Sequence, residues 1–329
     1  MESERPVESE PIDKPKKKSF GWIRMTLIFI LGAALVVMAL GYRRVKFGQD
    51  MGEGPAGPSV SREAFESEWS DRKVHLLGVG DSVTSGFGVA SNKTYFRMLI
   101  DNPPNDFEEM QGLCLSEVLP NLSSENIAVS GSNSQEHWDV QIESMETYPD
   151  DVFGLVVMTS GGNDLIHWYG RKPPKELAMY GATLEQAEPW IANFEERLGM
   201  MLDKIDASFP GGCLIFLADI YDPTDGVGKA PPLVPLPDWA DAMEILARYN
   251  EVISEAAEKR DCVQLVPMHQ EFLGHGLYCK SWFNPHYCSD DPHYWYGAVL
   301  EDPNERGYDA VRRLFLNEIV GRKDEIVGE

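Results

Sequence analysis

The stretch VHLLGVGDSV, residues 74–83, decides the fold of this 329-residue chain. Its first six residues, Val74–Val79, form a short apolar run that ends at a glycine, which is typical of a buried strand. Four later runs are also short and are bounded by Gly, Asp or Ser. These further predicted strands are Ile127–Val129, Phe153–Thr159, Cys213–Ile220 and Val263–Pro267.

Longer amphipathic segments lie between and after these runs. The predicted helices are Gln135–Met145, Leu184–Ser208, Trp239–Lys259 and Glu305–Val320. Strands that alternate with helices indicate an α/β fold, in which a parallel sheet is covered on both faces by right-handed crossovers. In such sheets, ligands bind at the carboxyl ends of the strands. Motifs that follow the predicted strands are therefore candidates for the functional site.

An uncharged apolar segment, residues 25–42, precedes this domain and is just long enough to cross a membrane as a helix. Lys and Arg flank it on both sides, and the bias favours a cytoplasmic N-terminus. A cleaved signal peptide is the alternative, although the segment ends at the dibasic pair Arg43-Arg44 and lacks a clear small-x-small cleavage site. We therefore expect a disordered cytoplasmic tail (1–24), a transmembrane signal anchor (25–42), a flexible linker (43–62) and one extracytoplasmic globular domain (63–329).

The charge of the chain is distributed unevenly. The first 46 residues hold 9 Lys and Arg against 5 Asp and Glu, so the remaining residues hold 20 against 48. A domain this acidic repels nucleic-acid phosphates and anionic lipid surfaces, so neither is an expected partner of the globular part.

The five cysteines and the acidic clusters give no metal-binding pattern. Cys279 and Cys288 are the most plausible disulfide pair, and two free thiols are the alternative. No Cys/His spacing indicates zinc, and the cluster Asp219, Asp222 and Asp225 lacks the spacing of a calcium loop. We predict no metal and no organic cofactor.

The first predicted strand runs directly into Gly80-Asp81-Ser82, which places a serine hydroxyl at its carboxyl end. On its own this tripeptide is explained equally well as a cap of the following turn. The α/β-hydrolase nucleophile elbow, Gly-x-Ser-x-Gly, is absent because Thr84 stands where its second glycine would be.

Two further motifs could stabilise a negative charge that develops near this serine. The backbone N–H of Gly131 follows the second predicted strand, and the Asn163 side chain follows the third, after two glycines. Both groups are hydrogen-bond donors of the kind that hold an oxyanion. A Gly-Asn turn between strand and helix is the plainer interpretation of the Asn163 motif, and Gly131 alone carries no weight.

Near the C-terminus, Asp290-Asp291-Pro292-His293 supplies an acid three residues before a histidine. A serine needs a base to take its proton, and a histidine base needs a carboxylate to orient it. Asp290 and His293 could fill both roles from one loop. His286 lies nearby but has no acid three residues upstream.

Taken in order, Gly80-Asp81-Ser82, Gly131, Gly161-x-Asn163 and Asp290-x-x-His293 resemble the four sequence blocks of the SGNH-hydrolase (GDSL-type) superfamily. The resemblance covers the whole predicted domain and implies a flavodoxin-like, three-layer α/β/α fold. It also implies that Ser82 is the nucleophile, that Ser82, Gly131 and Asn163 form the oxyanion hole, and that His293 is the base with Asp290 as its acid.

The chain departs from the family pattern in its last block, usually Asp-x-x-His-Pro-Asn-x-x-Gly. Asp302-Pro303-Asn304 matches the end of that block, but Asp302 occupies the histidine place and Val299 the acid place. The assignment of His293 makes residues 294–301 an insertion. His286 as the base and a histidine-free, inactive site remain alternatives, and we expect Asp302 to cap the last helix.

These motifs predict a serine esterase that acts on glycan, lipid or related esters outside the cytoplasm. One alternative is an acyltransferase that uses the same site to modify a polysaccharide hydroxyl. A second is an inactive, glycan-binding domain, because Asp302 stands at the histidine place. The sequence does not select the substrate or the oligomeric state.

Overall fold

The computed structural model describes residues 20–47, 49–232, 234, 236–297 and 299–328. Its centre is a five-stranded parallel sheet with the strand order β2-β1-β3-β4-β5. The strands are β1 (Lys73–Val79), β2 (Leu122–Asn126), β3 (Val152–Thr159), β4 (Cys213–Ala218) and β5 (Val263–Val266). The predicted α/β fold with a parallel sheet is confirmed.

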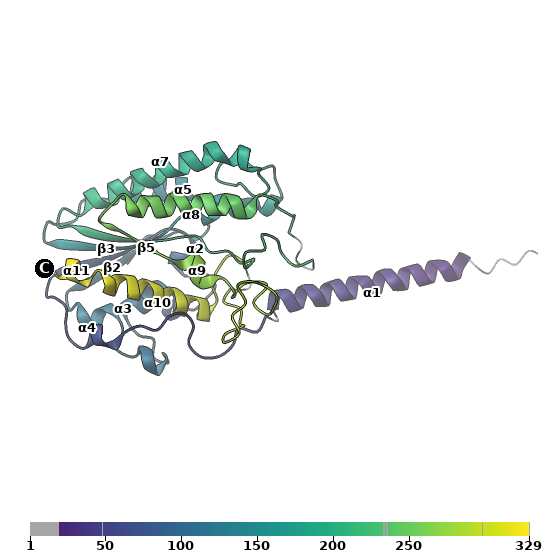
Figure 1. Ribbon diagram of the computed structural model, residues 1–329, viewed down its shortest axis with the longest axis horizontal. Coiled ribbons are helices and arrows are strands. Elements are labelled where there is room, and N and C mark those ends of the chain that lie inside the picture. Colours follow the sequence, from purple (N-terminus) through teal and green to yellow (C-terminus); the bar gives the residue numbers. More distant parts are fainter. Residues whose placement is uncertain (1–19, 48, 233, 235, 298, 329) are drawn as a thin grey trace, which may run out of the picture.

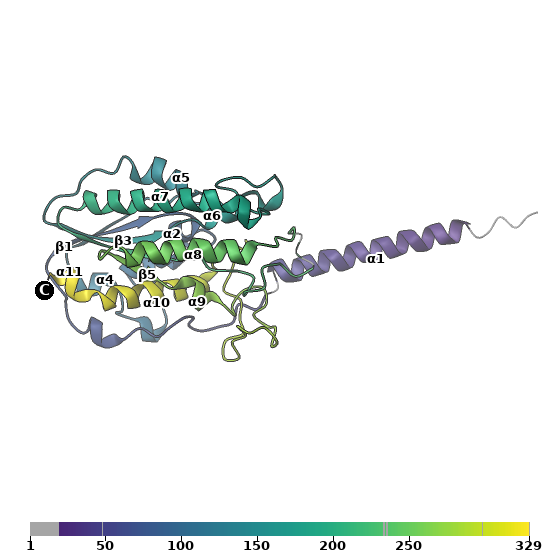
Figure 2. The same ribbon diagram turned by 45° about the horizontal axis from the view of Figure 1, so that its top comes forward.

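Helices cover both faces of this sheet, as Figures 1 and 2 show. One face packs against α7 (Leu184–Ser208) and α8 (Ala242–Glu258), and the other packs against α3 (Tyr95–Ile100) and α10 (Glu305–Gly321). The other described α-helices of the domain are α2 (Ser82–Ser85), α4 (Leu115–Val118), α5 (Ser134–Glu136), α6 (Gly162–Ile166), α9 (Met268–Phe272) and α11 (Lys323–Val327). The three-layer α/β/α architecture is therefore confirmed as well.

The sheet separates two apolar cores. Successive side chains of a strand point to opposite faces, so Leu76 of β1 packs in the core beneath α10 while Leu77 packs in the core beneath α7 and α8. Both leucines are fully buried. Strands buried on both faces read as continuous apolar runs, which is why β1, β3 and β4 are recognisable in the sequence.

The predicted position of the second strand is wrong. The strand is Leu122–Asn126, whereas we expected Ile127–Val129. Because β2 lies at the edge of the sheet and pairs only with β1, it carries the exposed polar residues Ser123, Ser124 and Glu125. An edge strand of this kind has no apolar run to recognise.

The predicted helix Gln135–Met145 is also shorter and less regular than expected. It consists of α5 followed by a π-helical turn over His137–Ile142, in which Glu143 N donates to Trp138 O across 2.8 Å. Trp239 precedes α8, and its indole N–H donates to the carbonyl oxygen of Ala182. The α7 and α10 boundaries agree with the sequence prediction to within one residue.

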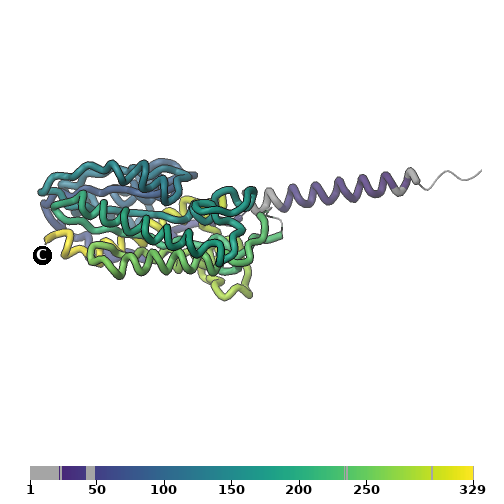
Figure 3. Tube along the Cα trace, turned by 90° about the horizontal axis from the view of Figure 1, so that it is seen from above, coloured from purple at the N-terminus to yellow at the C-terminus, as the bar shows by residue number. Residues whose placement is uncertain are grey.

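The apolar N-terminal segment lies within a single helix, α1 (Phe20–Phe47), which extends away from the globular domain (Figures 1 and 3). Its residues Arg24–Gly41 have a mean hydropathy of 2.1, and none of them is buried. By length and composition α1 can cross a membrane, and a signal sequence would meet the same test. Residues 1–19 of the predicted tail lie outside the described residues.

The segment after α1, which we expected to be a flexible linker, packs against the start of α10. The Arg306 guanidinium donates to the carbonyl oxygens of Met51 and Pro55, both across 2.9 Å. Ala56 is buried, and its N–H donates to the Asp309 carboxylate across 3.1 Å. Its glycines and prolines suggested a spacer, but distant side chains of α10 satisfy its backbone groups and hold it in place.

All five cysteines are free, so the expected Cys279–Cys288 disulfide is not formed. The Cys279 side chain is buried in the core beneath α10, whereas Cys288 lies half-buried in the following loop.

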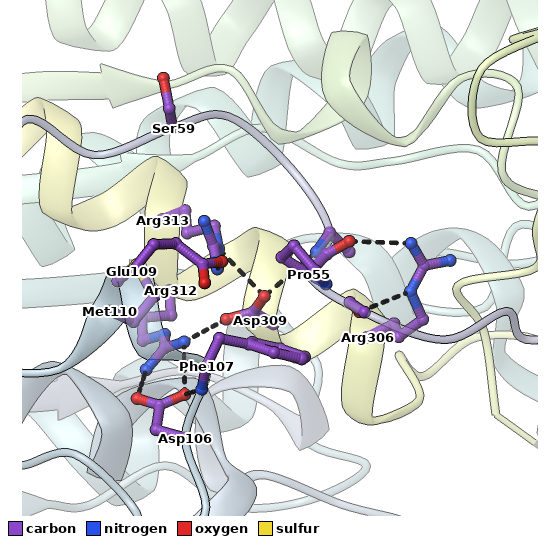
Figure 4. A network of polar contacts seen from close by, with 12 residues as sticks. Pro55, Ser59, Asp106, Phe107, Glu109, Met110, Arg306, Asp309, Arg312 and Arg313 are labelled. Atoms are coloured by element: carbon purple, nitrogen blue, oxygen red, sulfur yellow. Dashed lines mark hydrogen bonds and ion pairs between the residues drawn. The ribbon is translucent and has the colours of Figure 1, made fainter.

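A buried cluster of charges fixes α10 on its side of the sheet (Figure 4). Arg312 pairs with Asp106 across 2.5 Å and with Asp309, while Arg313 pairs with Asp309 and with Glu109, each across 2.9 Å. The two arginine side chains are 0% and 3% exposed. Asp309 therefore joins both arginines, and through Ala56 it also holds the segment that follows α1.

Removing Asp309 should destabilise the domain strongly, since it would leave two buried guanidinium groups short of a partner. We expect Asp309→Ala to lower the free energy of unfolding by about 3–5 kcal/mol. Urea unfolding of the full chain in detergent, followed by far-UV circular dichroism, measures this loss.

The matched control is Asp101→Ala, which breaks the Arg97–Asp101 pair. Both side chains of that pair are more than half exposed, so the expected change is at most about 0.5 kcal/mol. Equal effects of the two substitutions would contradict the role assigned to the cluster.

Candidate active site

The backbone at the end of β1 determines where Ser82 lies. Gly80 has a φ of +135°, and a Cβ atom at this position would lie 2.3 Å from the carbonyl oxygen of Thr159. Only glycine allows so close an approach of β1 to β3. Two residues later, Ser82 is the first residue of α2 and is 8% exposed.

Asp81 supports this turn and is not itself placed for catalysis. Its carboxylate caps α2 by accepting from the N–H of Val83 across 3.1 Å, and it accepts from the Thr159 hydroxyl across 2.9 Å. Burial raises the pKa of Asp81. These bonds join the end of β1 to the end of β3, so the position of Ser82 is coupled to that of the third motif.

The second motif lies beside the first. Gly131 has a φ of +83°, and no hydrogen-bond acceptor occupies its N–H among the described residues. The next residue, Ser132, donates its hydroxyl hydrogen to the carbonyl oxygen of Val129 across 2.7 Å, and the same hydroxyl lies 3.2 Å from the carbonyl oxygen of Gly80. Gln141 donates to the same carbonyl across 2.8 Å. The loop that carries Gly131 is therefore tied to the backbone just before Ser82.

The third motif joins the second through Asn163, a nearly buried residue of α6. Its amide nitrogen donates to the carbonyl oxygen of Ser132 across 2.9 Å. An amide carries two N–H groups, so this bond orients the side chain and leaves a second donor. Asn163 and Ser82 line the same cavity. The structure thus brings these two predicted residues together.

Asp164 holds α6 in place, and the sequence analysis did not single it out. It is fully buried and accepts from the N–H of Ser134 across 2.8 Å and from the Ser134 hydroxyl across 2.5 Å. Arg197 lies 4.0 Å from it, and burial raises the pKa of Asp164 to about 6. In the sequence, only its position next to Asn163 could have indicated that Asp164 matters for the site.

The predicted base and its predicted acid are not paired. His293 Nδ1 lies 2.5 Å from Oδ1 of Asp291, not from Asp290, and Asp290 instead accepts from the Ser289 hydroxyl. Arg306 forms an ion pair with the same Asp291 across 2.9 Å. Asp291 therefore pairs with His293, whereas we expected Asp290 to do so.

His293 also lies apart from the cavity that Ser82 lines. Neither His293 nor Asp290 is among the residues of its wall. A Cβ atom on Gly52 would lie 2.6 Å from the His293 ring, so this ring packs against the segment that follows α1. His286, the alternative base, instead lies against Gly226. None of His293, Asp290 and His286 lines the cavity at Ser82.

Asp302 is the residue that the structure places at Ser82. It is 3% exposed, and it lies near enough to Ser82 for that hydroxyl to offset part of the rise in the pKa of its carboxyl, although no hydrogen bond joins the two side chains. Its Oδ1 atom has no hydrogen-bond partner among the described residues. Our prediction that Asp302 caps α10 is wrong, because Asn304 accepts from the N–H groups of Arg306 and Gly307 and is the cap.

The cavity at Ser82 has a volume of about 160 Å³ and a largely apolar wall. Ser82, Asn163 and Glu301 are among the polar residues of this wall, whereas Asp302, which follows Glu301 in the sequence, is not among them. The apolar wall comes mainly from α6, α8 and the loop that precedes α8. Its side chains include Leu165, Ile166, Leu236, Trp239, Met243 and Leu246.

Residues 79–310 match the model of the GDSL-like lipase/acylhydrolase family. This range includes all three strand-end motifs and Asp302. No curated protein matches the sequence.

Solved structures of similar fold include an extracellular lipase from Streptomyces rimosus, which is 17% identical, with a TM-score of 0.49 over 74% of this chain and 98% of that one. Phospholipase A1 from Streptomyces albidoflavus is 16% identical, with a TM-score of 0.47 over 75% and 98% of the two chains. A lipase/acylhydrolase from Enterococcus faecalis is 16% identical, with a TM-score of 0.43 over 75% and 96%.

Proposed function

This chain belongs to the GDSL-like lipase/acylhydrolase family, a family of serine ester hydrolases, and we propose that it cleaves carboxylic esters with Ser82 as its nucleophile. One observation carries this proposal. Ser82 lines a largely apolar cavity whose wall also contains the oriented amide of Asn163. A nucleophile and an oxyanion donor on rigid elements around one cavity are the parts that acyl transfer requires.

The reaction that fits this arrangement has two steps. The Ser82 hydroxyl attacks the ester carbonyl, and the negative charge that develops on the carbonyl oxygen is held by the N–H groups of Ser82 and Gly131 and by the Asn163 amide. The alcohol leaves, and water then releases the acyl group from Ser82. The Asn163 amide is held by its bond to Ser132, and the bond between Ser134 and Asp164 holds α6 in place, so little reorganisation of this donor accompanies the reaction.

The apolar wall favours esters whose acyl group is a hydrocarbon chain. Each methylene that leaves water for such a wall contributes about 0.8 kcal/mol, so a chain of several carbons should bind better than acetate. Leu246 and Trp239 are nearly buried in this wall. We therefore favour lipid-like acyl esters over acetylated glycans.

The position of α1 fits an amphiphilic substrate. Figure 1 shows α1 leaving the domain at the end where the strands terminate in the site loops. The Asp50 carbonyl accepts from the N–H of Tyr294, so the segment after α1 is tied directly to the loop that leads to Asp302. We propose that α1 crosses the membrane with the N-terminus in the cytoplasm, as its flanking cations suggest, and that it keeps the site near the opposite membrane surface.

The first test is the nucleophile itself. Ser82→Ala should abolish turnover of a chromogenic hexanoate ester by the full chain in detergent, because it removes the hydroxyl that forms the acyl intermediate. A serine-reactive fluorophosphonate should label the unmodified protein at Ser82, as peptide mass spectrometry can establish.

Ser85→Ala is a matched control, since Ser85 belongs to the same short helix and its hydroxyl only donates to the carbonyl oxygen of Ser82. It should keep most of the turnover. Absence of both turnover and labelling in the unmodified protein would sink the enzyme proposal and favour a non-catalytic binding domain. Turnover that rises only when a glycan is added would instead indicate an acyltransferase.

The second test concerns the cavity. Met243→Trp fills part of the wall, so it should lower kcat/KM for octanoate esters by about tenfold or more while changing that for acetate esters little. Met200→Trp, on the exposed side of α7, is the control. An unchanged chain-length preference in Met243→Trp would show that the acyl chain binds elsewhere.

A further inference from the structure

We propose that Asp302 is the general base of Ser82, in the place that the family pattern gives to a histidine. This inference rests on the proposed function, because it concerns how the same nucleophile is activated. The sequence alone suggested two other roles for Asp302, as a cap of the last helix and as a sign of an inactive site.

Bonds within its own loop fix the position of Asp302. Its carbonyl oxygen accepts from the N–H of Gly297 across 2.6 Å, and Pro303 pairs with Tyr296 in an isolated bridge. Asn304 donates its amide to the carbonyl oxygens of Tyr294 and Tyr296, across 2.6 and 3.1 Å. These bonds fold the loop back onto itself just before α10. As a result, the Asp302 carboxylate is buried near Ser82, and its Oδ1 atom has no hydrogen-bond partner among the described residues.

The surroundings of Asp302 keep it available as a base. The titratable groups that act on it are the carboxylates of Asp81 and Glu301 and the phenols of Tyr169, Tyr221 and Tyr308. No Lys, Arg or His is among the groups that shift the pKa of Asp302 in the part of the chain that the structure describes.

With no cation to compensate, burial raises the pKa of Asp302 to about 7. An ordinary aspartate is too weak a base to take a proton from a serine at neutral pH. A carboxylate with a pKa near the working pH is a much better one, and enzymes tune carboxyl groups in this way.

The proton balance is complete with Asp302 alone. As the bond between the Ser82 oxygen and the carbonyl carbon forms, the Ser82 proton passes to the Asp302 carboxylate and the carbonyl electron pair becomes the oxyanion. When the oxyanion collapses, the bond to the alcohol oxygen breaks and Asp302 returns its proton to that oxygen. Water repeats both steps in deacylation, and Asp302 ends ionised again.

His293 then has a structural role rather than that of a base. Asp291 accepts from His293 and also pairs with Arg306, which in turn binds the carbonyl oxygens of Met51 and Pro55. His293 is thus part of the junction between the loop, α10 and the segment that follows α1.

The test compares three single variants of the full chain in detergent, with kcat for hexanoate ester hydrolysis as the readout. Asp302→Asn keeps the size of the side chain but removes the base, so kcat should fall by about 100-fold or more. Asp302→His restores a base at the same place and should recover a large part of that loss. Thermal unfolding of each variant establishes that it is folded.

Three results would overturn the proposal. Asp302→Asn could keep kcat within threefold, or His293→Ala could abolish turnover while Asp302→Asn does not. Alternatively, Asp302→His could be as inactive as Asp302→Asn although both are folded. In each case, turnover that still requires Ser82 would leave the proposed function intact, so the two proposals fail separately.

Discussion

The buried pairs of Arg312 and Arg313 with Asp309 fix the position of α10, and the site depends on where that helix begins. The same Asp309 binds the segment that follows α1, and the first turn of α10 supplies Arg306 to the Asp291 junction. Asn304 caps the helix and draws the preceding loop inward. The position of the loop that carries Asp302 therefore depends on how these charge pairs hold α10.

Sequence reasoning succeeded where burial or strand ends leave a local signal. The strands β1, β3 and β4 appear as apolar runs because both faces of the sheet are covered, whereas the exposed edge strand β2 has no such run. Ser82 and Asn163 directly follow two of the buried strands, so their proximity follows from the parallel sheet. The position of Asp302 depends on how a long loop folds back, and the spacing of Asp290 and His293 did not indicate that His293 pairs with Asp291 instead.

The raised pKa of Asp302 makes the free energy of unfolding depend on pH. The pKa of Asp302 is raised from 3.8 to about 7, so the folded protein binds this proton more tightly than the unfolded chain does. The free energy of unfolding therefore falls as the pH rises from about 4 to about 7, and this loss stays constant above a pH of about 7. Asp302 makes no ion pair in return. A buried, uncompensated carboxylate next to a nucleophile is expected at a functional site rather than at a structural one.

The central claim is that a carboxylate activates Ser82, and the pH dependence of its labelling tests this most directly. The rate of fluorophosphonate labelling should rise with pH to a plateau, with a midpoint near the pKa of the base. A less polar solvent favours the neutral form of an acid–base pair, which raises the pKa of a carboxyl group and lowers that of an imidazole. With a modest fraction of dimethyl sulfoxide in the buffer, the account predicts that the midpoint moves to higher pH; a shift to lower pH would identify a histidine base and contradict it.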